Sequence, residues 1–158
     1  MSLDKLTFRQ ALGQFATGVC VVTTVPHGKA PIGMTINSFA SVSLEPALVL
    51  WSIQNNSECF ADFEAADGFA INVLSSEQGA LSSQYARKVE HRLEAAHFRL
   101  GKSGNPVLKG ALTTFECRVW ARYPGGDHQI LVGEVLELDM RPTGKPLLFH
   151  KGLYGQVH

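Results

Sequence analysis

The chain has no long hydrophobic run, no excess charge of either sign and no secretory signal pattern. Its 158 residues include 14 basic and 14 acidic side chains, and charged residues make up 18% of the total. Such a balance gives no long-range field that would attract nucleic acid or an anionic membrane. No apolar stretch approaches the length of a membrane-spanning helix, and residues 1–5 lack a basic segment followed by an apolar one. We therefore expect a cytoplasmic protein that binds neither nucleic acid nor membrane.

The cysteines and histidines form no metal-ligand pattern. Cys20, Cys59 and Cys117 are odd in number and far apart, with no Cys-x-x-Cys spacing. This predicts buried free thiols rather than a disulfide framework or a zinc site. Glu94 and His97 have the Glu-x-x-His spacing, but a di-iron site also needs matching carboxylates on another helix. We expect this pair to lie on a solvated face and the protein to hold no metal.

Several familiar catalytic motifs are also missing. The chain contains no Gly-x-Ser-x-Gly, no Walker loop, no Gly-x-Gly-x-x-Gly and no His-Glu-x-x-His. The absence of these motifs is compatible with a reaction carried out by bound cofactors, but it does not by itself indicate one.

The hydrophobic pattern predicts one domain over residues 1–158, built mainly from strands. Its length is enough to bury roughly two-thirds of the unfolded surface. Short hairpin connections rather than long crossovers favour an antiparallel β-barrel with helices over its openings. The predicted strands cover 19–25, 32–39, 47–53, 69–74, 111–123, 129–140 and 147–150, and the predicted helices cover 8–16, 58–67 and 75–85.

Two local patterns are especially clear. Phe8, Leu12 and Phe15 recur at helical intervals, and Thr7 with Gln10 resembles a capping box, so we expect a packed helix beginning after Thr7. The turn residues 124–128 join two long apolar runs and give the strongest hairpin signal in the sequence. His128 is predicted to lie at the tip of that hairpin.

A hydroxyl-rich segment around residues 33–43 is the first candidate binding region. If 32–39 is a strand, Met34 and Ile36 share one face, while Gly33, Thr35 and Asn37 share the other. A face with a glycine, a hydroxyl and an amide would allow a planar polar molecule to lie close to the backbone. The alternative is an ordinary solvent-facing strand surface.

Two other polar residues have both a binding and a structural interpretation. Ser57 is a possible N-cap, and a helix start is a favourable place for a phosphate, although many helices begin with serine. Asn72 lies in the middle of an apolar strand and must find partners if it is buried. A ligand is one such partner, and a neighbouring strand is the other.

Much of the chain resembles the flavin reductase-like family of short-chain NAD(P)H:flavin oxidoreductases. The resemblance rests on Gly33-Met34-Thr35-x-Asn37-Ser38-Phe39-x-Ser41-Val42-Ser43-Leu44-x-Pro46 and on shorter matches at 17–24, 71–75, 126–128 and 150–154. It implies an FMN-binding split barrel, an antiparallel β-fold with a few peripheral helices. It also implies a homodimer that uses NADH or NADPH to reduce FMN or FAD and supplies the reduced flavin to a partner monooxygenase.

The resemblance assigns roles to individual residues. It implies no catalytic side chain, because the hydride passes directly between two stacked rings. His128 and Tyr154 are expected on the nicotinamide side, and Ser57 and Arg92 at the flavin phosphate. The remaining flavin contacts are expected from Thr35, Ile36, Asn37, Ser38, Ser41, Trp51, Ser52, Ile53, Asn72, Val73, Leu74 and Gln78. The family often has a hydroxyl residue at the position of Cys59 and a phenylalanine at that of Leu93. These departures bear more on the residues assigned to the flavin phosphate than on those assigned to the ring.

Two other functions are compatible with these residues. One is a module that holds FMN tightly as a sensor or electron relay, with little reductase turnover. The other is a reductase that passes electrons through bound flavin to a different acceptor, such as a corrinoid. The sequence does not choose between FMN and FAD, between NADH and NADPH, or between a tightly bound and a diffusible flavin.

Overall fold

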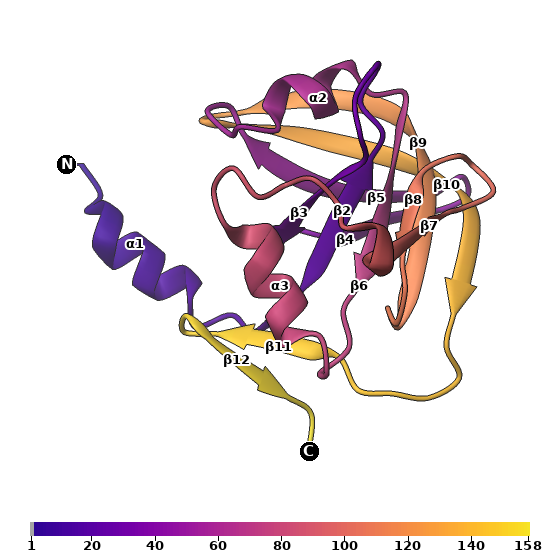
Figure 1. Cartoon of the computed structure of the whole chain (residues 1–158). Helices are drawn as coiled ribbons and strands as arrows, with labels where there is room; N and C mark the ends of the chain where they lie inside the picture. The colour runs from indigo at the N-terminus through magenta and orange to yellow at the C-terminus, as the bar shows by residue number, and fades with distance from the viewer. Residues whose placement is uncertain (1) are drawn as a thin grey trace.

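The computed structural model describes residues 2–158 and has a mainly β architecture with few helices (Figure 1). This confirms the predicted class. The helices are α1 (Lys5–Leu12), α2 (Phe60–Ala65) and α3 (Gly79–Ala86), with a 3-10 turn η1 (Ala95–His97). The strands are β1 (Thr17–Gly18), β2 (Cys20–Thr24), β3 (Ile32–Ile36), β4 (Ala40–Leu44), β5 (Ala47–Gln54), β6 (Gly68–Val73), β7 (Phe98–Leu100), β8 (Pro106–Leu108), β9 (Thr113–Gly125), β10 (His128–Met140), β11 (Leu147–His150) and β12 (Leu153–Gln156).

Seven strands form the main sheet in the order β3-β2-β6-β9-β10-β5-β4. All neighbours pair antiparallel, as the short connections predict. Within residues 2–158, β3 and β4 are edge strands and no ladder joins them, so the sheet is not closed by hydrogen bonds. β7 and β8 form a separate two-stranded sheet.

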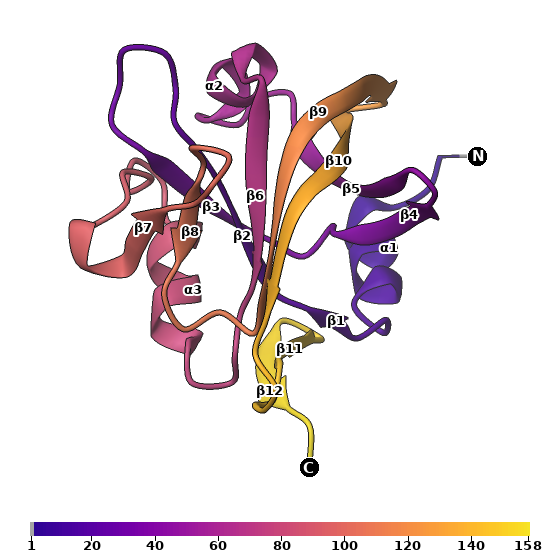
Figure 2. The same cartoon turned by 90° about the vertical axis from the view of Figure 1, so that its right-hand side faces the viewer.

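The long hairpin of β9 and β10 is the centre of the sheet (Figure 2). Its turn is Gly126-Asp127, and Gly126 has φ +68°, a conformation that suits glycine in a tight hairpin turn. Register shifts at Val132/Gly133 and Val135/Glu137 allow the hairpin to bend. The predicted hairpin is confirmed, and it places His128 directly after the turn.

Two buried clusters hold the fold together. The larger one lies within the main sheet and includes Trp51, Phe63 and Phe69, with the rings of Phe63 and Phe69 edge-on to that of Trp51. The smaller cluster lies between the sheet and α3 and includes Val21 and Tyr85. Strand β2 is buried along its whole length because it contributes to both clusters.

The N-terminal helix differs from the prediction. The N-cap of α1 is Asp4, whose carboxylate accepts hydrogen bonds from the Thr7 N–H (3.0 Å) and hydroxyl (2.7 Å). The helix ends at Leu12, and none of its residues is buried. Phe15, predicted to pack, is 78% exposed. Figure 1 shows α1 standing apart from the body, so the helical spacing identified a helix but not a packed one.

A small sheet joins the two ends of the chain. β1 pairs with β11, which pairs with β12, so Thr17 lies opposite Phe149 and Phe149 opposite Tyr154. The sequence predicted β11 but not β12, where no residue is buried. This sheet lies below the main sheet in Figures 1 and 2.

The prediction about the thiols can be compared directly with the structure of residues 2–158. Cys20, Cys59 and Cys117 are buried and free, as expected. Burial raises the pKa of each thiol to about 12. No described helix is both long and apolar enough to cross a membrane.

Candidate functional site

The end of β3 opens into a pocket of about 280 Å³. Its walls come from the end of β3 and the segment that follows it, from β5, from the loop before α2 and from the start of β10. The β5–β10 ladder pairs Gln54 with His128, which explains why the hairpin tip meets the end of β5 here. Eight residues assigned by the sequence line the pocket: Thr35, Ile36, Asn37, Ser38, Ser52, Ile53, Ser57 and His128.

The face that was expected to be open is largely covered. A Cβ on Gly33 would lie 2.8 Å from Leu93 Cδ2, so this glycine makes room for Leu93 rather than for a ligand. The Thr35 hydroxyl donates to the Ser82 carbonyl of α3 at 2.6 Å. Only Asn37 is exposed, because it lies beyond the end of β3. Thus the alternation was predicted correctly, but the second face packs against α3 and Leu93 instead of lying open.

Ser38 fixes one wall of the pocket. Its hydroxyl accepts from the Ser52 N–H (3.0 Å) and donates to the Ser52 carbonyl (3.2 Å), so it takes the place of a partner strand beside β5. Ser52 was assigned a flavin contact, but Ser38 already binds its backbone N–H and one acceptor site of its carbonyl.

Ser57 has a different local role from the one predicted. The N-cap of α2 is Cys59, which makes no side-chain cap bond, and α2 has only six residues. The Ser57 hydroxyl instead accepts from the Cys59 N–H (3.2 Å) and donates to the Met34 thioether (3.6 Å). A thioether is a weak acceptor, so this hydroxyl can turn to a stronger one in the pocket.

His128 is held by its neighbour in the hairpin turn. Its Nδ1 lies 2.6 Å from the Asp127 carboxylate, which leaves Nε2 as the ring nitrogen able to contact a ligand. The pKa of Asp127 is lowered, first by the hydrogen bond from His128 and then by the charges of His128 and of Lys5 in α1. The turn is tied to the β5–α2 loop, because the Asn55 N–H donates to the Asp127 carbonyl at 2.9 Å.

A second pocket, of about 230 Å³, is lined by the same segment. It shares Thr35, Ile36 and Asn37 with the first and adds Phe149 and Tyr154. Tyr154 is exposed, and its hydroxyl lies 2.6 Å from that of Ser82. The two residues expected on the nicotinamide side therefore line different pockets, which share Asn37.

The sequence left open whether a ligand or a neighbouring strand satisfies the Asn72 amide, and in the structure neighbouring strands do so. Its side chain is fully buried and donates to the Val21 carbonyl (2.9 Å) and the Thr23 hydroxyl (3.2 Å). Its oxygen accepts from the Leu108 N–H (2.9 Å) and the Thr114 hydroxyl (3.4 Å). This amide links strands and has no free group to offer a ligand.

The other assigned residues also lie outside the two pockets. Trp51 and Leu74 are core side chains. The Gln78 side chain accepts from the Ser75 N–H and donates to the Lys109 carbonyl. The remaining three are Ser41 and Arg92, which are exposed, and Val73, which is half-buried.

The sequence missed Met34 and Gln54, which both line the first pocket. Gln54 could have been found, because it follows Ile53 directly at the end of a predicted strand. Also missed was the pair formed by Glu58 and His91, whose Oε2 and Nε2 are 3.3 Å apart. Glu58 also accepts from the Val89 N–H at 2.7 Å, which ties the loop containing Arg92 to the Ser57 loop.

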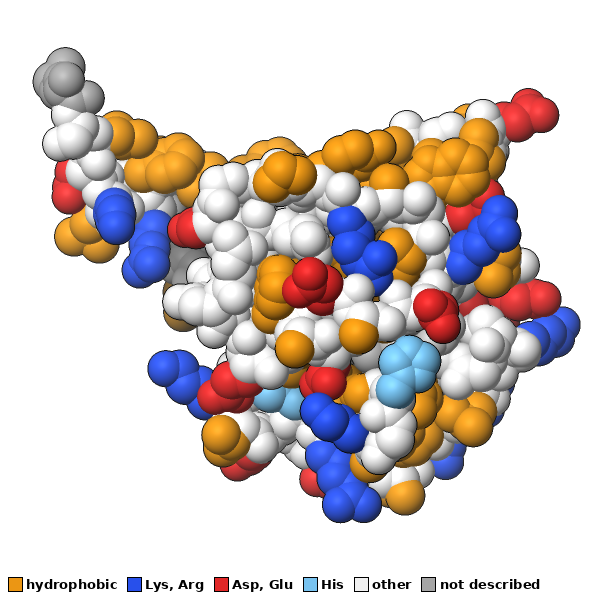
Figure 3. Space-filling view, turned by 90° about the horizontal axis from the view of Figure 1, so that it is seen from above, with side chains coloured by type: hydrophobic (Ala, Val, Ile, Leu, Met, Phe, Trp, Pro, Cys, Tyr) orange, Lys and Arg blue, Asp and Glu red, His pale blue; other side chains and the backbone are white. Residues whose placement is uncertain are grey.

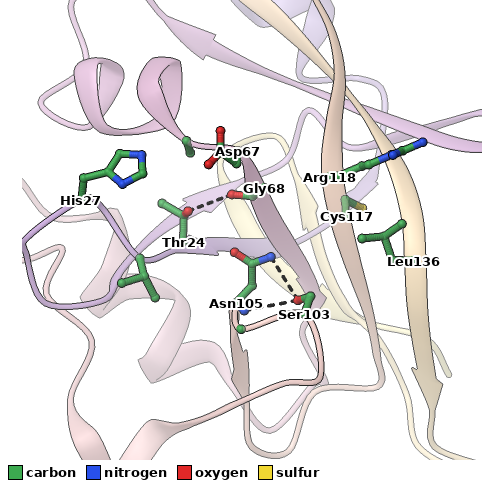
Figure 4. A pocket seen from close by; sticks show the side chains of 12 residues that line it. Thr24, His27, Asp67, Gly68, Ser103, Asn105, Cys117, Arg118 and Leu136 are labelled. Carbon is green, nitrogen blue, oxygen red and sulfur yellow. Dashed lines mark hydrogen bonds between the residues drawn. The ribbon is translucent and has the colours of Figure 1, made fainter.

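A separate hollow of about 320 Å³ lies away from these pockets, with Thr24, His27, Asp67 and Asn105 among its walls (Figure 4). Two of its polar side chains bond to other residues of its wall. Thr24 donates to the Gly68 carbonyl, and Asn105 donates to the Ser103 hydroxyl. None of the residues assigned from the sequence lines this hollow.

Comparison with known proteins identifies the family. Residues 12–158 match the model of the flavin reductase like domain, which is nearly the whole chain. The chain belongs to the flavin reductase-like family. Its relatives include the FMN reductase (NADH) SmoA of Agrobacterium fabrum, 48% identical over 151 residues, covering 95% of this chain and 84% of that protein.

Two other relatives of the flavin reductase-like chain add context. The reductase subunit HsaB of a Mycobacterium tuberculosis flavin-dependent monooxygenase is 38% identical, over 96% of this chain and 82% of that one. The solved structure of the Streptomyces globisporus NADH:FAD oxidoreductase SgcE6, in complex with NAD and FAD fragments, matches with a TM-score of 0.92. It is 34% identical and covers 100% of this chain and 98% of that chain.

Proposed function

We propose that this protein is an NAD(P)H:flavin oxidoreductase that reduces FMN or FAD and delivers the reduced flavin to a partner monooxygenase. The observation that carries the proposal is the pocket at the end of β3, which gathers eight assigned residues from four separate segments. The family match and the names of the relatives, an NADH-dependent FMN reductase and a monooxygenase reductase subunit, support the same conclusion.

The residues of the pocket fit a flavin. Asn37 is exposed at the pocket, and the Ser57 hydroxyl donates only to a thioether, so both can offer donors to a polar ligand. Ile36 and Ile53 supply apolar surface for a ring. A bound flavin would supply the acceptor for a hydride from the nicotinamide. The protein's own part is to position the two substrates, with Ser38 fixing the wall and Asp127 orienting His128.

The phosphate assignment rests on the loops beside this pocket. Ser57 lines it, and the bonds from Glu58 to His91 and Val89 keep the loop that bears Arg92 next to Ser57. We assign Ser57 and Arg92 to the flavin phosphate and His128 to the nicotinamide side on this basis. Weaker binding of FMN, but not of riboflavin, to an Arg92→Gln variant is the expected result. Equal loss for both flavins would remove Arg92 from the phosphate site.

We also assign the main sheet to the split-barrel type and the molecule to a homodimer. The two edge strands, β3 and β4, are joined in the sequence by the short segment that contains Ser38. Such a short connection requires the sheet to curve, so that its two edges approach each other near the pocket that Ser38 lines. Hydrophobic side chains run in a row from the α1 arm across one edge of the body (Figure 3). Leu6 of α1 is 64% exposed, and Leu44 of edge strand β4 is 98% exposed. A second copy would cover such surface, and light scattering should give twice the chain mass.

A direct assay tests the function. Purified protein is mixed aerobically with NADH, and FMN or FAD is added in steps. For the proposed reductase, the rate of NADH loss rises with added flavin and saturates. A yellow protein that consumes no NADH would instead support the tight flavin-binding module. Flavin-independent NADH loss that requires an added corrinoid would support the other acceptor.

A further inference from the structure

The chain that follows α3 returns to the edge of the main sheet. The Gly33 N–H donates to the His91 carbonyl at 2.8 Å, and the Leu93 N–H donates to the backbone just before β3 at 2.9 Å. An antiparallel bridge at Arg92 lies between these two bonds. Because side chains alternate along an extended segment, His91 and Leu93 lie on one face and Arg92 on the other. The backbone of β3 therefore fixes where the His91 ring lies.

The His91 ring lies between two hydrogen-bond acceptors. Its Nδ1 is 3.3 Å from the Gly33 carbonyl oxygen, and its Nε2 is 3.3 Å from Oε2 of Glu58. A carbonyl oxygen can only accept, and Glu58 Oε2 already accepts the Val89 N–H at 2.7 Å. A neutral imidazole has one N–H and can satisfy one of the two contacts, whereas the protonated ring donates to both. Only 15% of the His91 side chain is exposed, so water has little access to a ring nitrogen that loses its partner.

Glu58 places a negative charge beside the residue assigned to the flavin phosphate. It directly follows Ser57, which lines the first pocket. Within residues 2–158, His91 is the only basic side chain within 4 Å of the Glu58 carboxylate. An uncompensated carboxylate would repel a phosphate bound at Ser57, because like charges that share a site oppose each other. Protonated His91 reduces this repulsion by pairing with Glu58.

The acidic side chains on the surrounding elements are paired with other groups or exposed. In the loop that bears the ring, Glu90 pairs with Arg87 at 3.7 Å. In α2, Asp62 pairs with Lys29 at 3.1 Å, and Glu64 is exposed. Strand β3 has no charged side chain. Glu58 is therefore the carboxylate whose charge depends on the ring.

The remaining titratable groups of this region do not change charge in the same way. Lys88 and Arg92 stay positive at every pH near neutrality. Tyr85 of α3 stays neutral there, because burial raises the pKa of its hydroxyl. That hydroxyl is 2.7 Å from Nδ1 of His97, which lies near Glu94 and not Glu58. The His91 ring is thus the group that can switch the charge balance at Ser57, since histidine gains or loses its proton between about pH 5 and 8.

We propose that His91 and Glu58 are positioning residues for the flavin phosphate, with His91 acting in its protonated form. The protonated ring neutralises the carboxylate beside Ser57 and holds the loop of Arg92 against it. When the ring loses its proton at higher pH, Glu58 keeps a free negative charge and the loop loses one of its ties. Phosphorylated flavins then bind more weakly as the pH rises through neutrality, whereas riboflavin, which has no phosphate, does not respond. This inference rests on the proposed function, because it takes a flavin as the ligand of the pocket.

The test measures the binding of FMN and of riboflavin by flavin fluorescence between about pH 5.5 and 8.5, at constant ionic strength and without NADH. The phosphate of FMN also ionises in this range, so wild type is compared with His91→Gln at each pH. At the low end we expect wild type to bind FMN at least about fivefold more tightly than the variant, and at the high end within about twofold. Riboflavin should bind both proteins within about twofold throughout.

The control for this comparison is His27→Gln. His27 is exposed and lines neither pocket of the candidate site, so this variant should follow wild type at every pH.

A second variant, Glu58→Gln, separates a charge effect from a purely structural one. It removes the negative charge but keeps an oxygen that can accept from the Val89 N–H. At about pH 8.5 we expect it to bind FMN at least about threefold more tightly than wild type, because the repulsion is gone. A pair that only held the loop in place would give weaker binding when one of its members is changed.

Three results overturn the inference. They are parallel FMN curves for wild type and His91→Gln, equal losses of FMN and riboflavin in His91→Gln, and weaker FMN binding by Glu58→Gln near pH 8.5. If His91→Gln does not fold, Glu58→Gln decides alone, because the Glu58 side chain is 42% exposed. A protein that shows the expected binding curves but oxidises no NADH would contradict the proposed function and leave this assignment standing. Failure of wild type to bind FMN at any pH would contradict both.

Discussion

The hydroxyls of Tyr154 and Ser82 lie 2.6 Å apart and join the last strand to α3. The Ser82 carbonyl accepts from the Thr35 hydroxyl, also at 2.6 Å, so Ser82 connects the β11–β12 hairpin to β3. The side wall of the site therefore depends on contacts between three segments that are distant in sequence.

This relationship predicts unequal effects for its two partners. Tyr154→Phe leaves the fully buried Ser82 hydroxyl without its partner and should cost ~1–3 kcal/mol, whereas Ser82→Ala leaves an exposed tyrosine that water can reach and should cost less. Urea unfolding measures both, and hydrogen exchange at 153–156 should increase in each. Tyr123→Phe, at an exposed position, is the control and should stay within about 0.5 kcal/mol of wild type. Equal effects for the three variants would contradict the linkage.

Asn37 should matter for binding and not for folding. Its side chain is exposed and lines both pockets of the candidate site, so Asn37→Leu should lower flavin affinity at least tenfold through the loss of hydrogen bonds worth ~1 kcal/mol or more each. Flavin fluorescence titration measures the dissociation constant. Asn56→Leu, an exposed position outside these cavities, is the matched control. An unchanged constant for Asn37→Leu would exclude Asn37 from the site.

Two strand glycines should respond oppositely to alanine. A Cβ at Gly133 would lie 2.5 Å from Phe69 Cζ and 2.9 Å from Cys117 Cβ, so Gly133→Ala should overpack the core and cost ~1–3 kcal/mol. At Gly155 nothing lies within 4 Å, so Gly155→Ala should be neutral or stabilise by about 0.4–1 kcal/mol. The free energies of unfolding of both variants give the comparison. A stable Gly133→Ala protein would mean that the Phe69 ring can move aside.

The buried thiols predict a loss of stability in alkaline solution. Burial raises the folded pKa of Cys20 to about 12 from an ordinary value of 9.0, so above pH ~9 the unfolded chain releases a proton that the folded chain retains. Rising pH therefore favours unfolding over this window. Between pH 9 and 10.5 under reducing conditions, wild-type unfolding free energy should fall relative to that of Cys20→Ala by up to ~1.4 kcal/mol per pH unit. Parallel curves for the two proteins would contradict this assignment.

The sequence predicted most of the strands because their apolar runs were long and bounded by turn residues. The β9–β10 hairpin is the clearest example, since its turn chemistry and both runs agree. The packing partners of each face could not be predicted. Gly33 and Thr35 had a pattern that suits a ligand, but Leu93 and Ser82 cover them.

Other errors have a similar physical cause. The spacing of Phe8, Leu12 and Phe15 was read as a core-facing stripe, although no layer of this chain lies against it. Asn72 was ambiguous, because a buried amide looks the same in sequence whether a ligand or a strand satisfies it. Strand β12 has no buried residue, so no apolar alternation marks it.

The small sheet that joins Thr17 to Phe149 has a consequence for synthesis on the ribosome. Phe149, Lys151 and Tyr154 follow every strand of the main sheet in the sequence, yet they wall two of the cavities that meet at Asn37. A nascent chain from which only the main sheet has emerged therefore lacks these walls, so both cavities form after that sheet has been made.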